Sequence, residues 1–72
     1  MKLPRDASGF DVIKALRRLG FQQVRQTGSH VQLVQGDRHV TVPAHGSVAV
    51  GTLRNILRQA GIDLETFLIN LH

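Results

Sequence analysis

Apolar residues near the start of the chain recur with the spacing of an amphipathic helix. They are Val12, Ile13, Leu16 and Leu19. Ser8 precedes them as a good N-cap, and Asp11 stands three residues later in a capping-box-like arrangement. Gly20 follows them and is a typical helix stop. The pattern therefore predicts a helix over residues 9 to 19.

A second helical pattern begins at Thr52 and is ended by Gly61. Its apolar positions are Leu53, Ile56, Leu57 and Ala60. Asp63 can cap a last short helix that runs over residues 64 to 68 or slightly beyond. The chain from Thr52 onward is thus expected to be mainly helical.

The segment between these helices has the alternation of β-strands. The predicted strands cover residues 21 to 26, 30 to 34 and 38 to 42. A Gly-containing loop at residues 27–29 and the pair Gly36-Asp37 join them as hairpins, and Pro43 ends the third strand. The expected fold class is α+β: a helix, a three-stranded antiparallel sheet, a helix and a short C-terminal helix.

Alternation also assigns the two faces of the sheet. The face toward the helices should carry Val31, Leu33, Val40 and Val42, and the solvated face His30, Gln32, His39 and Thr41. Each of the three Phe residues, Phe10, Phe21 and Phe67, is expected in the core. RNA binding, if present, should then rest on backbone contacts and shape rather than on base stacking.

The 72 residues suffice for one small domain, residues 1–72. The chain has no Cys, so it offers no disulfide and no thiolate chemistry. The first nine residues contain no apolar stretch of signal-peptide length, and no segment approaches a membrane span. We therefore expect a cytoplasmic protein with no membrane contact.

Nine Lys and Arg against five Asp and Glu give a formal net charge of +4. This excess on a small surface favours a polyanionic partner such as nucleic acid, although it can also serve solubility alone. Lys14 and Arg17 lie on the polar side of the first helix, where they either face solvent or contact phosphates.

The whole pattern resembles the HicA family of toxin mRNA interferases, from about residue 10 to residue 68. The stretches that carry this resemblance are LGF, RQTGSH, VTVPAH and GTLRNILRQAGI, in this order and spacing. The resemblance implies a fold similar to a double-stranded RNA-binding domain. It also implies cleavage of single-stranded or messenger RNA by His30, and a HicB-like antitoxin that blocks this histidine. Many relatives carry a second His where this chain has Val31, which the alternation directs to the core.

The residues themselves fit such chemistry without a metal ion. RNA carries its own nucleophile, the 2′-OH, and a histidine near pH 7 is well suited to remove its proton. Arg25 is a candidate to stabilise the charge that develops on the phosphate, and Lys14 is a weaker one. The expected products are a 2′,3′-cyclic phosphate and a 5′-OH.

Other residues are candidates for supporting roles. Gly28 allows a tight turn, and Ser29 either orients His30 or is a plain turn residue. No general acid is evident, although His39 shares the predicted face. His45 lies in a loop, where it could contact RNA or the antitoxin.

A zinc site is the rival chemistry. His39 and His45 have metal-like spacing, and His30 would make a third ligand. Nothing in the sequence brings the three together, so we expect no metal and no cofactor. Two further hypotheses stay open: a non-catalytic RNA-binding module of the same fold, and a domain that only binds an antitoxin-like protein.

Overall fold

The computed structural model describes residues 7–71. The elements along the chain are α1 (Gly9–Arg18), β1 (Gln22–Thr27), β2 (His30–Gln35), β3 (Arg38–Pro43), α2 (Val50–Ala60) and α3 (Leu64–Asn70). This order confirms the predicted α+β layout, whereas the likeness to a double-stranded RNA-binding domain stays a prediction. Residues 1–6, which make up most of the N-terminal segment considered in the sequence, lie outside the described residues, as does His72.

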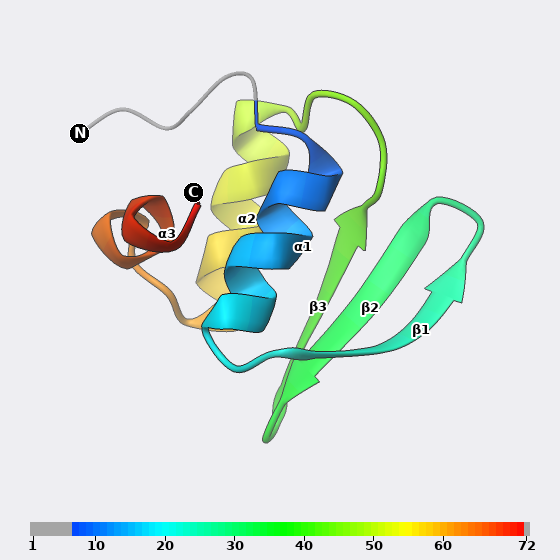
Figure 1. The fold of residues 1–72 in the computed structure, drawn as a ribbon, viewed down its shortest axis with the longest axis horizontal. Coiled ribbons are helices and arrows are strands. Elements are labelled where there is room, and N and C mark those ends of the chain that lie inside the picture. Colours follow the sequence, from blue (N-terminus) through cyan, green and yellow to red (C-terminus); the bar gives the residue numbers. More distant parts are fainter. Residues whose placement is uncertain (1–6, 72) are drawn as a thin grey trace.

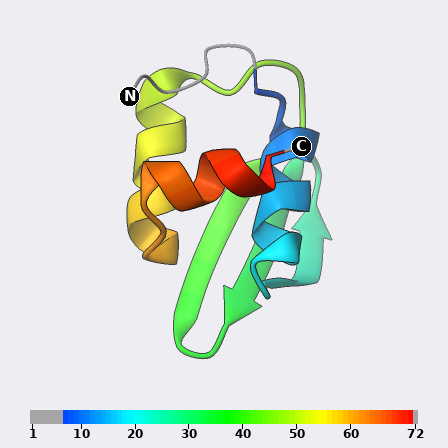
Figure 2. The ribbon, with the colours of Figure 1, turned by 60° about the vertical axis from the view of Figure 1, so that its left-hand side comes forward.

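The strands form one antiparallel sheet in the order β1-β2-β3. Helices α1 and α2 lie together on one face of this sheet, and α3 lies across them on the side away from it (Figures 1 and 2). We call the face toward the helices the inner face and the open one the outer face. Strand β1 is an edge strand whose residues are all exposed, because the helices do not extend over it (Figure 1).

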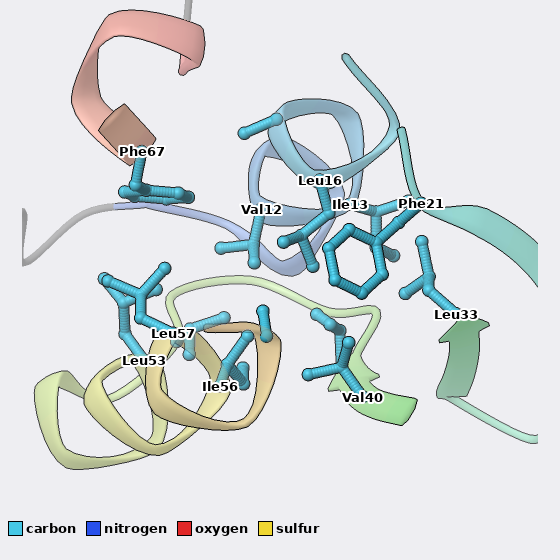
Figure 3. Packing of buried hydrophobic residues seen from close by; sticks show 14 of the residues in the cluster. Val12, Ile13, Leu16, Phe21, Leu33, Val40, Leu53, Ile56, Leu57 and Phe67 are labelled. Carbon is cyan, nitrogen blue, oxygen red and sulfur yellow. The ribbon is translucent and has the colours of Figure 1, made fainter. Parts of the chain in front are cut away.

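The core lies between the inner face of the sheet and the helices, where side chains from both layers interdigitate (Figure 3). The predicted core positions of the sheet are all buried: Val31, Leu33, Val40 and Val42. Phe21 and Phe67 are buried as predicted, and Phe67 attaches α3 to the rest of the core. The prediction for Phe10 is wrong, because this residue is 58% exposed on the side of α1 that points away from the core.

Local capping explains where the helices begin and end. Ser8 and Asp11 form the predicted capping box, in which each side chain accepts from the other residue's backbone N–H. Gly61 ends α2 with a φ of 70°, in the left-handed region that favours glycine. Helix α2 begins at Val50, two residues before the predicted Thr52, and its N-cap residue makes no side-chain hydrogen bond that could have signalled this start.

The first hairpin is tighter than predicted. Thr27 belongs to β1 and pairs with His30, so the loop consists of Gly28 and Ser29 alone. Gly28 has a φ of 60°, whereas no residue other than glycine has a positive φ within residues 7–71. This sign pattern, with Gly at the first loop position, is that of a type II′ turn. The second hairpin, at Gly36-Asp37, has the predicted two-residue loop.

Within residues 7–71, no helix is both long and apolar enough to cross a membrane.

Candidate active site at the first hairpin

The first hairpin holds His30 at a fixed and open position. His30 is the first residue of β2, with Thr27 opposite it on β1 and Pro43 opposite it on β3. Pairing on both sides fixes its backbone, while its side chain is exposed on the outer face, as the alternation predicts. An imidazole that is fixed at its base and open at its tip can reach a polymer lying over the sheet.

A β-bulge in β1 brings Arg25 to the same face as His30. The register of β1 shifts between Gln23 and Arg25, so that Val24 has no partner on β2. Arg25 then lies opposite Gln32, whose side chain shares the outer face with His30. Arg25 and His30 are therefore diagonal cross-strand neighbours, which places their backbones about 7–8 Å apart, within reach of a long side chain. Bulges recur beside active sites because they redirect a side chain in this way.

His39 lies on the outer face as predicted, but not beside His30. His39 pairs with Val34, which stands four residues along β2 from His30. At about 3.4 Å per residue the two histidines are about 14 Å apart along the sheet. The two histidines are therefore badly placed to act on one phosphate. If a nucleic acid lay over the outer face, His39 would face a part of it distant from His30.

The segment that follows β3 packs beside the His30 turn. The backbone N–H of Ala44 donates to the carbonyl of Ser29, which joins this segment to the hairpin loop. His45 follows directly and is exposed. Its carbonyl accepts from the N–H of Gly9 at 2.9 Å, so it lies where the first helix begins. The structure thus brings His45 to the same end of the molecule as His30.

Lys14 and Arg17 belong to a different surface. Both are exposed on α1, which packs against the inner face of the sheet, whereas His30 points from the outer face. Lys14 is the weaker sequence candidate for stabilising the phosphate at His30, and its position on the helix side does not favour that role.

Among residues 7–71, no position of the outer face holds a carboxylate. Its positions, read from the strand register, are Gln22, Arg25, Thr27, His30, Gln32, Val34, His39, Thr41 and Pro43. Asp37 lies in the hairpin turn at the opposite end of the sheet from His30. A polyanion can therefore lie across this face without meeting like charge.

Metal ligands are not gathered anywhere in the described part of the chain. Among residues 7–71, no group of three His, Asp or Glu side chains lies close enough to hold a metal ion. The spacing of His39 and His45 therefore does not translate into a ligand cluster with His30.

Sequence reasoning missed two features near this site. Phe10 is exposed and shares one side of α1 with Lys14 and Arg17, and this was readable from their spacing of four and three residues. Gly9 begins α1 against the end of β3, where a Cβ atom would overlap the carbonyl oxygen of Pro43. No local signal announces this contact, since it joins segments far apart in the chain.

Comparison with known proteins extends the resemblance found in the sequence. Residues 9–62, about three quarters of the chain, match the family model described as the HicA toxin of bacterial toxin–antitoxin systems. A search of curated proteins finds no significant match. The matched segment contains the hairpin with His30 and the bulge, and it ends between α2 and α3.

Proposed function

The chain belongs to the HicA toxin family of bacterial toxin–antitoxin systems, and we propose that it is a metal-independent endoribonuclease that cleaves messenger RNA at His30. The family match supports the role as a toxin. The observation that supports the chemistry is the placement of exposed His30 and Arg25 as diagonal neighbours on an outer face to which the described part of the chain contributes no carboxylate.

The proposed reaction uses the 2′-OH of the RNA as the nucleophile. The imidazole of His30 removes the 2′-OH proton as the 2′-oxygen attacks the adjacent phosphorus atom. The bond from phosphorus to the 5′-oxygen breaks, and that oxygen takes a proton from a water molecule, which the proton held on His30 then restores. The products are a 2′,3′-cyclic phosphate and a 5′-OH, so no external water is consumed in the cleavage step.

The remaining site residues stabilise and position. The guanidinium of Arg25 binds the non-bridging phosphate oxygens, whose negative charge grows in the transition state. Gly28 has no atom within 4 Å of the place a Cβ would occupy, so the turn leaves room for the RNA backbone to pass. Ser29 contributes its hydroxyl as a hydrogen-bond partner for a phosphate at this turn.

The family also implies an antitoxin partner. We propose a HicB-like protein that covers the outer face at His30 and so withholds the imidazole from RNA. An acidic or polar surface would complement the side chains that this face presents.

The direct test is cleavage of a labelled messenger RNA in EDTA by the wild-type protein and by His30→Ala. Because His30 is exposed, the variant should fold as the wild type does, which circular dichroism can establish. We expect cleavage by the wild type, none by the variant, and partial recovery of the variant on addition of free imidazole. Gln59→Ala, a change on the exposed side of α2, serves as the matched control and should keep the wild-type rate.

Two outcomes would contradict the proposal. Cleavage by both proteins would assign the activity to another residue or to a contaminant. Absence of cleavage by either, with both still shifting RNA in a gel, would leave a non-catalytic RNA-binding module of this fold.

A further inference from the structure

The surface of α1 beside β1 combines an exposed aromatic ring with cations, and nothing proposed so far uses it. Phe10, Lys14 and Arg17 are all exposed. Residues of an α-helix follow one another by about 100°, so these three fall within about 60° of one another. They therefore form one stripe along the helix. An exposed Phe on a basic stripe is unusual, because large apolar side chains are most often buried.

Two contacts show which way this stripe faces. Arg18 lies beside Lys14 around the helix. It donates from Nη1 to the carbonyl of Asn70 at 2.9 Å, so this side of α1 faces α3. Arg17 instead lines a shallow groove together with Phe21 and the first residues of β1. The Arg17 end of the stripe thus lies next to the start of β1.

Strand β1 supplies the floor of this surface. Gln23 pairs with Leu33 and Gln26 with Val31, and both partners are buried inner-face residues. Gln23 and Gln26 therefore belong to the inner face, yet they are exposed, because β1 extends past the helices. We call the stripe of Phe10, Lys14 and Arg17 with this floor the α1–β1 shelf.

The shelf leads to the site at His30. Gly9, which precedes Phe10, donates its N–H to the carbonyls of His45 and Gly46, at the end of β3 where Pro43 pairs with His30. Helix α1 then runs away from this end toward Arg17 and the start of β1. Phe10, the residue after Gly9, thus stands at the end of the shelf nearest to the hairpin that carries His30.

We propose that the α1–β1 shelf binds the single-stranded RNA segment next to the cleaved bond, with Phe10 stacking on one of its bases. This inference rests on the proposed function, which places the cleaved bond at His30. Lys14 and Arg17 bind phosphates, and the floor amides offer hydrogen bonds to sugar or base edges. The RNA then passes over the Gly28-Ser29 turn to the outer face.

Charge selects RNA as the occupant. The stripe has two cations and no carboxylate of its own. The carboxylate of α1, that of Asp11, accepts a hydrogen bond from the backbone N–H of Ser8 in the capping box. An exposed ring beside cations is the combination by which proteins bind single strands without strong sequence preference. The ring adds base stacking, whereas the sequence predicts binding by backbone contacts and shape alone.

Binding of a fluorescein-labelled single-stranded RNA of about 12 nucleotides tests the shelf. Anisotropy is measured in the His30→Ala background, so that cleavage does not consume the probe. Phe10→Ala should weaken binding about 5- to 150-fold, the effect of losing one stacked base, whereas Phe10→Trp should retain it. Ile69→Ala, which removes an apolar side chain 72% exposed on α3, is the matched control and should bind as the background does.

Stacking itself has a spectroscopic signature. With 2-aminopurine placed in turn along the RNA, one or two positions should lose fluorescence on binding, and Phe10→Ala should abolish that loss. Equal affinities for Phe10→Ala and Ile69→Ala would overturn the inference. So would unchanged RNA binding together with lost inhibition by the antitoxin, since that result assigns the shelf to the protein partner.

Cleavage by the wild-type protein, followed in parallel, separates this inference from the proposed function. If the wild type cleaves and Phe10→Ala binds RNA normally, only the shelf fails. If the wild type does not cleave but Phe10→Ala loses binding, the shelf stands and the ribonuclease proposal fails.

Discussion

Replacing Gly9 by Ala tests how tightly the start of α1 is held against the end of β3. The added Cβ would overlap the carbonyl oxygen of Pro43 and lie 2.8 Å from its carbonyl carbon and 2.9 Å from Cα of Ala44. Carbon atoms in ordinary contact are about 3.5–4.0 Å apart, so the two backbones must separate by about 1 Å. That movement strains the hydrogen bonds from Gly9 to His45 and Gly46.

The expected cost follows from these contacts. Overpacking a tight site costs about 1–3 kcal/mol, and each weakened hydrogen bond adds about 1 kcal/mol. A domain of 72 residues has a free energy of unfolding of only about 4–11 kcal/mol. We therefore expect Gly9→Ala to lower Tm by at least about 10 °C.

Thermal unfolding followed by circular dichroism measures this effect, and a second glycine provides the control. Gly51 lies in α2 with nothing within 4 Å of an added Cβ. Gly51→Ala should raise the free energy of unfolding by up to about 1 kcal/mol, because Ala favours the helix. A Gly9→Ala protein that melts within about 3 °C of the wild type would refute the close approach of α1 and β3.

Three further changes test the core, a helix cap and the site. Phe67→Ala removes a fully buried ring that holds α3 and should cost about 3–5 kcal/mol in urea unfolding; a loss below about 1 kcal/mol would contradict this packing. Hydrogen bonds from the hydroxyl and the N–H of Thr66 lower the pKa of Asp63 from its ordinary 3.8. The stability that this cap contributes is thus present above pH 3.8 and is lost as the pH falls through the lowered pKa. The difference in free energy of unfolding between the wild type and Asp63→Asn should therefore shrink in acid, and a difference that grows would contradict this. Arg25→Gln should lower kcat/KM for RNA about 10²–10³-fold, whereas Arg54→Gln on the exposed side of α2 should leave it unchanged; equal rates would remove Arg25 from the site.

The sequence predicted the elements wherever burial leaves a periodic pattern. Both long helices and the inner faces of β2 and β3 follow from apolar spacing, because those positions face one core. His30 was placed correctly on the outer face for the same reason: its neighbour Val31 is buried, which fixes the alternation.

Features without burial left no such pattern. All residues of β1 are exposed, so the bulge at Val24, which sets the face of Arg25, leaves no trace in the alternation of apolar residues. The residue type of Phe10 predicts a core position, although its place on α1 is opposite the buried side. The tight contact at Gly9 depends on a distant strand end, which no local pattern encodes.

The central claim is that His30 activates the 2′-OH of the RNA itself. The most direct measurement uses an RNA cleaved at one mapped position and a second RNA with a single 2′-deoxynucleotide there. If the 2′-OH is the nucleophile, the first RNA yields a 2′,3′-cyclic phosphate and a 5′-OH, and the second is not cut at that position. Cleavage of the 2′-deoxy RNA at the same position, with a 5′-phosphate on the product, would contradict it.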